Sequence, residues 1–137
     1  MLTLLIISKN NEFLQKCRSS FRKIGYRNIC ADNMLEGLKE VKWSFPDLII
    51  WNTETITTSD KKVLSILKHQ YSTLPLLFVI NNDELVNQLG NVSEELIFRN
   101  NDIEKLTIKV VELIGEPQPT GKYAEDNFET DMSLSDF

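Results

Sequence analysis

The chain has 137 residues, of which 42% are hydrophobic and 26% are charged, a composition typical of a single soluble globular domain. No apolar run approaches the roughly 20 residues that a membrane-spanning helix needs. The N-terminus also lacks a basic segment followed by a cleavage site. We therefore expect a cytoplasmic protein without membrane insertion.

The net charge of -5 comes from the C-terminal part of the chain. Residues 116–137 hold six of the 20 acids and one of the 15 bases, which leaves 14 acids and 14 bases in residues 1–115. A neutral body argues against a nucleic-acid-binding protein, which would carry a basic excess. Cys17 and Cys30 fall on apolar positions outside any CxxC or Cys/His cluster, so we expect free thiols and no metal site.

The first third of the chain predicts two strand–helix units. Apolar runs at residues 2–7 and 27–31 predict strands. Between them, a helix begins after a cap at Asn10 or Asn11 and ends at Gly25, with an apolar face made of Phe13, Cys17, Phe21 and Ile24. The next helix begins at a capping box formed by Asn33 and Glu36, with a face made of Leu35, Leu38 and Val41.

The remaining residues predict three further units. Residues 45–52 predict a central strand that is buried on both faces and ends in Asn52. A helix at residues 60–71 and a strand at 74–80 follow. The later residues predict a short helix at 83–89 and a strand at 95–98. The last predicted helix is capped by Asn101 or Asp102 and ends at Gly115. Five such units predict an α/β flavodoxin-like fold with a five-stranded parallel sheet and right-handed crossovers.

This pattern resembles the receiver domain of response regulators over residues 2–115. The segments LTLLIIS, FPDLIIWN, LPLLFVIN and LIFRN match the first, third, fourth and fifth strands of that family. In receivers, the first strand leads into an acid pair that binds Mg²⁺, and the third ends in the phosphoacceptor aspartate. The fourth strand ends in Ser or Thr, and a lysine follows the fifth.

Each of these functional positions differs in this chain. The residues found there are Ser8 and Lys9 at the acid pair, Asn52 at the phosphoacceptor, Ile80 at the hydroxyl residue, Arg99 at the lysine and Leu96 at the aromatic switch position. An amide is a weak nucleophile beside a carboxylate, and Mg²⁺ prefers carboxylate oxygens. We therefore expect a degenerate receiver, or pseudo-receiver, without a phosphoryl group, a metal, a cofactor or enzymatic activity.

Two alternatives remain for the crevice at the carboxyl ends of the strands. Lys9 and Arg99, with Ser8 and Asn52 as neutral donors, would bind an anion and make the chain a sensor of a small anion or nucleotide. Alternatively, the two cations point into water or pair with Asp83 or Glu54. We favour this second alternative, because no glycine-rich phosphate loop accompanies the cations.

The C-terminal residues predict a separate segment. Two prolines in residues 116–121 predict a linker, so we expect a receiver-like domain at residues 1–115 and, at 116–137, a linker followed by a disordered acidic tail. The tail interleaves acids with large apolar residues, among them Phe128, Met132 and Phe137, which predicts a segment that folds on a basic, hydrophobic partner. A solubilising tail and a tail packed on its own domain are the alternatives.

The leading hypothesis is a phosphorylation-independent protein–protein interaction module of a bacterial signalling pathway. Receivers commonly signal through the fourth helix, the fifth strand and the last helix, so the resemblance implies partner contacts at Leu85, Phe98, Lys105 and Lys109. The sequence leaves open whether the body forms a homodimer.

Overall fold

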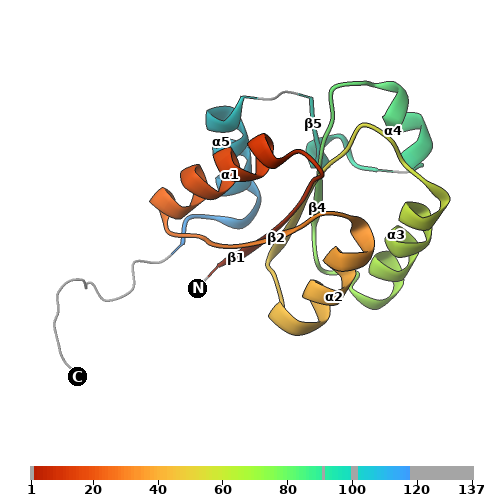
Figure 1. Ribbon diagram of the computed structural model, residues 1–137, viewed down its shortest axis with the longest axis horizontal. Coiled ribbons are helices and arrows are strands. Elements are labelled where there is room, and N and C mark those ends of the chain that lie inside the picture. The colour runs from red at the N-terminus through yellow and green to blue at the C-terminus, as the bar shows by residue number, and fades with distance from the viewer. Residues whose placement is uncertain (1, 91, 100–101, 118–137) are drawn as a thin grey trace, which may run out of the picture.

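The computed structural model describes residues 2–90, 92–99 and 102–117. These residues form a parallel sheet in the order β2-β1-β3-β4-β5, with helices on both faces (Figure 1). The strands are β1 (Thr3–Ile7), β2 (Arg27–Ala31), β3 (Leu48–Asn52), β4 (Leu76–Val79) and β5 (Ile97–Phe98). The helices are α1 (Asn11–Ile24), α2 (Met34–Ser44), α3 (Thr58–Gln70), α4 (Glu84–Leu89) and α5 (Ile103–Ile114), and a 3₁₀ turn, η1 (Glu94–Leu96), precedes β5. The predicted flavodoxin-like fold is confirmed.

The parallel register places the carboxyl ends of the strands at one edge of the sheet and their amino ends at the opposite edge. β1 lies between β2 and β3, and Ile7 is opposite both Ala31 and Trp51. Asn52 is opposite Val79 in the same way. The strands therefore end together at one edge, the carboxyl edge. Each helix runs back to the other edge, where the strands begin, which we call the amino edge.

The sheet separates two hydrophobic cores because neighbouring side chains of a strand point to opposite faces. Leu4 and Ile6 join the core shared with α1 and α5, whereas Leu5 and Ile7 join the core beneath α2, α3 and α4. The same alternation holds in β3 and β4. Residues 4–7, 48–51 and 77–80 are at most 5% exposed, as expected for parallel strands that are covered on both faces.

The first helix begins and ends as predicted. Asn10 is the N-cap, and its side chain accepts a hydrogen bond from the Phe13 amide at 3.1 Å. Gly25 ends the helix with φ of +112°, a left-handed conformation that favours glycine. The predicted face is wrong at its end, because Ile24 is 37% exposed and Leu14 is buried instead.

The rotation of α2 about its axis differs from the prediction. Asn33 caps the helix, but Leu35 is 58% exposed, and the buried positions are Met34, Gly37, Leu38 and Val41. A Cβ atom on Gly37 would lie 2.4 Å from the Ile7 Cδ1 atom, so this glycine allows the helix to approach β1 closely. The close approach at Gly37 turns Met34 inward and Leu35 outward.

Several boundaries are shorter or shifted. α3 begins at Thr58 rather than residue 60, because Thr57 and Asp60 form a capping box. β4 covers four residues of the predicted seven, and the first half of the predicted fifth strand is η1. The division into a domain at residues 1–115 and a tail beyond it stays a prediction, since residues 118–137 lie outside the described residues, as does the alternative cap Asn101.

Both cysteines are free, as predicted. Burial, with a smaller contribution from Cys30, raises the pKa of the Cys17 thiol to about 12. Within the described ranges, no three His, Cys, Asp or Glu side chains are grouped in a way that could hold a metal ion. None of the helices described here has the length and apolar character required to cross a membrane.

Candidate functional site

A chain of neutral hydrogen bonds occupies the carboxyl edge of the sheet, where the sequence predicts the crevice. Ser8 is 2% exposed. Its hydroxyl donates to Asn52 Oδ1 at 2.8 Å and accepts from the backbone amide of Asn10 at 3.0 Å. Asn52 Nδ2 in turn donates to the Val79 carbonyl at 3.2 Å. Both ends of the Asn52 amide are therefore bonded to neighbouring segments, so this side chain ties β1, β3 and β4 together.

The donor set of this edge does not fit Mg²⁺, the ion that a receiver resemblance implies. Ser8 and Asn52 are neutral and already bonded to each other, and the adjacent Lys9 is an exposed cation. One acid outside the predicted site, Asp32, directly follows β2 and is exposed. Mg²⁺ is held in proteins by carboxylates and phosphates with near-octahedral geometry, and a single exposed carboxylate provides little of that.

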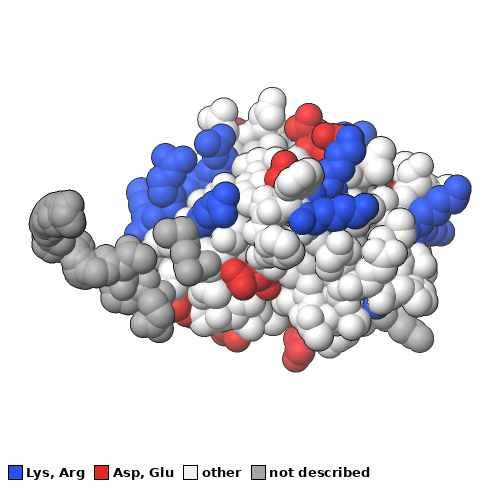
Figure 2. Space-filling model, turned by 90° about the horizontal axis from the view of Figure 1, so that it is seen from below, with Lys and Arg blue, Asp and Glu red and all other residues white. Residues whose placement is uncertain are grey.

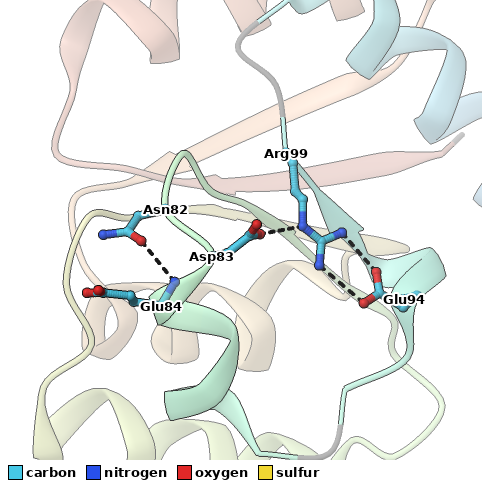
Figure 3. A network of polar contacts seen from close by, with 5 residues as sticks. All are labelled: Asn82, Asp83, Glu84, Glu94 and Arg99. Atoms are coloured by element: carbon cyan, nitrogen blue, oxygen red, sulfur yellow. Dashed lines mark hydrogen bonds and ion pairs between the residues drawn. The ribbon is translucent and has the colours of Figure 1, made fainter.

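Arg99 is held in a clamp of two acids (Figure 3). Its Nε donates to Asp83 Oδ1 at 2.6 Å, and its two terminal nitrogens donate to the Glu94 carboxylate at 2.8 and 3.1 Å. These hydrogen bonds, first those that Glu94 accepts and then the one that Asp83 accepts, raise the pKa of Arg99, and the bonds from Arg99 hold the pKa of Glu94 below its usual value. The pairing with Asp83 is one of the arrangements included in the alternative favoured from the sequence, which also named Glu54 and water; Glu94 is an additional partner.

The clamp changes the charge that Arg99 presents to a ligand. One guanidinium between two carboxylates leaves a local charge of about -1, and its planar donor fork is already used bidentately by Glu94. Asn82 and Glu84 stand beside the clamp, where the Asn82 side chain accepts from the Glu84 amide at 2.9 Å. The negative charge of these surrounding acids disfavours the binding of an anion at Arg99.

The remaining degenerate positions are apolar. Ile80 is 1% exposed and belongs to the core beneath α2 and α3, so no polar group stands at the place of the receiver hydroxyl. Leu96 is half-buried within η1 rather than on a strand.

The predicted partner face needs one correction. Leu85 is 4% exposed, because the six-residue helix α4 places Leu85 and Leu89, four residues apart, against the core. Phe98 and Lys109 are half-buried, and Lys105 is exposed. Ile108, which was not among the predicted contacts, is 61% exposed on α5 one turn beyond Lys105. The predicted tail contacts Phe128, Met132 and Phe137 lie outside the described residues.

A second feature missed by sequence analysis is an apolar pocket of about 400 Å³. It lies between the end of α3, the start of β4 and the segment that joins α4 to β5; the residues that line it include Leu67, Tyr71, Leu74, Leu89 and Leu96. The weak helical signal after Asn81, which corresponds to a very short α4, is the sequence feature that could have indicated it.

Comparison with known proteins identifies the fold. No protein-family model and no curated protein sequence matches the chain. Among solved structures, a response regulator receiver domain protein from Clostridium thermocellum is 17% identical, with a TM-score of 0.65 over 83% of this chain and 94% of that one. The receiver domain of a Francisella response regulator gives 18% identity and a TM-score of 0.67 over 83% and 97%. A response regulator from Thermotoga maritima, in complex with Mg²⁺ and BeF, gives 17% and 0.67 over 82% and 99%. The structure is therefore similar to receiver domains in fold.

Proposed function

We propose that this chain is a cytoplasmic, non-enzymatic pseudo-receiver that acts through protein partners without phosphorylation. The observation that carries the proposal is the hydrogen-bonded chain from Ser8 through Asn52 to the Val79 carbonyl. An aspartyl phosphate requires a free carboxylate nucleophile and a metal ion to neutralise the transferred phosphoryl group. At this edge, a neutral amide bonded on both sides takes the place of the nucleophile.

The alternative of a small-anion or nucleotide sensor receives less support. Such a sensor would use the cations of Lys9 and Arg99, but the guanidinium of Arg99 already binds Glu94 and Asp83. An anion would have to displace a bidentate carboxylate and approach a second one. The arrangement is instead suited to fixing the start of α4 against η1, because Asp83 directly precedes α4 and Glu94 begins η1.

The partner surface proposed for this module includes the exposed side of α5. Ile108 lies at its centre, with Glu104 and Lys105 on the preceding turn and Glu112 on the following one, all exposed. Large apolar side chains with a polar rim are the usual anchors of protein interfaces. Lys105 and the half-buried Lys109 balance the charges of Glu104 and Glu112, so the polar rim around Ile108 carries both signs of charge.

The test is a quantitative pull-down with the full chain as bait, in the presence and absence of Mg²⁺ and acetyl phosphate. We expect one partner to be captured equally under both conditions. Ile108→Glu is expected to weaken its binding about tenfold or more, because it places a charge at the centre of the interface.

Leu35→Glu is the matched control, since Leu35 is 58% exposed on α2 and Ile108 is 61% exposed on α5. It should leave partner binding unchanged. A partner that binds only after treatment with acetyl phosphate would contradict phosphorylation independence, and a partner lost equally with both variants would contradict the assignment of the α5 surface.

A further inference from the structure

The amino edge of the sheet carries two highly exposed aromatic side chains. Trp43, in the last turn of α2, is 82% exposed, and Phe45, just beyond the helix, is 77% exposed. Phe45 has φ of +48°, the left-handed region that bulky residues rarely adopt. A left-handed residue is a common way to end a helix, but glycine or asparagine is usual there, so a contact made by the ring would account for an exposed phenylalanine at this position.

Basic side chains surround this edge. Arg22 and Lys23 lie in the last turn of α1, Arg27 begins β2, and Lys42 lies in the last turn of α2. All four are exposed. Figure 2 shows basic side chains on this side of the molecule at the left, where α1 lies in Figure 1, towards the middle and at the right, with some acidic side chains beside and below the middle ones. The nearby carboxylate of Asp47 accepts from the Thr3 amide at 2.7 Å and is thus used within the sheet.

The last described residues, 115–117, lie at the same edge. The Tyr26 hydroxyl donates to the Gly115 carbonyl and fixes the end of α5. Burial, with a smaller effect from Glu116, raises the pKa of Tyr26, so the hydroxyl stays a donor at neutral pH. A Cβ atom on Gly25 would lie 3.5 Å from Pro117 Cγ, which places Pro117 at the end of α1, the helix whose last turn carries Arg22 and Lys23.

We propose that residues 123–132 of the same chain dock on the amino edge. This segment has the complementary composition, with four acids (Glu125, Asp126, Glu129, Asp131) among three large apolar residues (Tyr123, Phe128, Met132). The apolar side chains contact Trp43 and Phe45, and the acids lie beside the bases of α1, β2 and α2. A partner that binds either the segment or the edge has to displace this contact, which gives the module an internal competitor.

The length of the connecting chain permits this arrangement. Trp43 and Phe45 lie at the end of α2, which covers the opposite face of the sheet from α1, so the segment has to pass across the amino edge, a distance of roughly 20 Å if each helix layer lies about 10 Å from the sheet. About ten extended residues between Pro117 and Phe128 span up to roughly 35 Å. A short flexible tether also provides an effective concentration of about 1 mM. A contact with a Kd near 1 mM would then be formed about half of the time, so a weak interaction is sufficient.

Trp43 provides the measurement, because Trp51 is 3% exposed and contributes little to quenching by a neutral solute. Acrylamide quenching of tryptophan fluorescence is compared between the full wild-type chain and a tail variant. The tail variant combines four substitutions: Phe128→Ala, Glu125→Gln, Asp126→Asn and Glu129→Gln. We expect the Stern–Volmer constant to be about twofold higher in this variant, as half-occupied docking predicts. Added salt should raise the constant of the wild type towards that value, because it screens the charge contacts.

A body variant tests the other side of the contact. Arg22→Glu with Lys23→Glu should raise quenching as much as the tail variant does. Lys61→Glu with Lys62→Glu makes the same charge change on exposed residues in the first turns of α3, at the opposite edge, and should not. Equal quenching of wild type and tail variant would overturn the proposal. Protection of Trp43 that grows with protein concentration would also overturn it, because a second copy would then supply the segment.

Discussion

Phe21→Ala is expected to lower the free energy of unfolding by about 3–5 kcal/mol, the range for removing a fully buried aromatic side chain. Phe21 is 0% exposed and packs edge-on against the Tyr26 ring, with centroids 6.0 Å apart. It belongs to the core between the sheet, α1 and α5. Its removal leaves a cavity and also loosens Tyr26, whose hydroxyl holds the end of α5. Urea unfolding, monitored by circular dichroism, measures the change.

Phe45→Ala is the matched control because it removes the same ring from a position that is 77% exposed. A change within about 0.5 kcal/mol is expected there, as for other surface substitutions. If the two variants were destabilised equally, Phe21 would not be a core residue and the packing of α1 on the sheet would be wrong.

Asn52→Asp is expected to destabilise the chain by about 1–3 kcal/mol at neutral pH. The substitution removes the donor to the Val79 carbonyl and sets a carboxylate oxygen against that carbonyl, although Ser8 can still donate. The carboxylate is disfavoured in the folded state, so its folded pKa is raised above the unfolded value. Protonation of the introduced carboxylate restores a hydrogen-bond donor, so the loss of stability should become smaller as the pH falls through that raised pKa. Urea unfolding at a series of pH values tests both the loss and its pH dependence.

Asn33→Asp makes the same chemical change at the exposed N-cap of α2. Its side chain accepts from the Glu36 amide at 2.9 Å, a role in which aspartate and asparagine are nearly equivalent. We expect little change in stability from this control. If Asn52→Asp were equally neutral at pH 7, the Asn52 amide would not be the tie between β3 and β4 that we describe.

Local sequence rules predicted the elements well where a single residue determines the geometry. Gly25 and Asn10 fixed the ends of α1, and the bounds of β2 agree with the prediction. Rotation of a helix about its axis is harder, because Leu35 and Met34 offer equally apolar faces. The contact between Gly37 and Ile7 decides between them, and it depends on the distance from α2 to β1, which no local pattern encodes.

The candidate site could be predicted in part. The strand ends placed Ser8 and Asn52 at a common edge, because parallel strands end together, and the structure joins them by a hydrogen bond. The second partner of Arg99 was not predictable, since Glu94 lies in a turn whose conformation has no clear sequence signal. The burial of Leu85 was accessible to sequence reasoning, because Leu85 and Leu89 recur at helical spacing.

The most direct test of phosphorylation independence is an NMR titration of the full chain with Mg²⁺ and beryllofluoride, which mimics a phosphoryl group on a carboxylate. The amide signals of Ser8, Asn52 and Arg99 report on the carboxyl edge. We expect that none of these signals shifts beyond the change caused by salt alone. The side-chain amide of Asn52 is hydrogen-bonded through both its oxygen and its nitrogen, and the side chains at this edge do not fit Mg²⁺ as ligands. Saturable shifts centred on Asn52 would show an intact phosphorylation site and contradict the account.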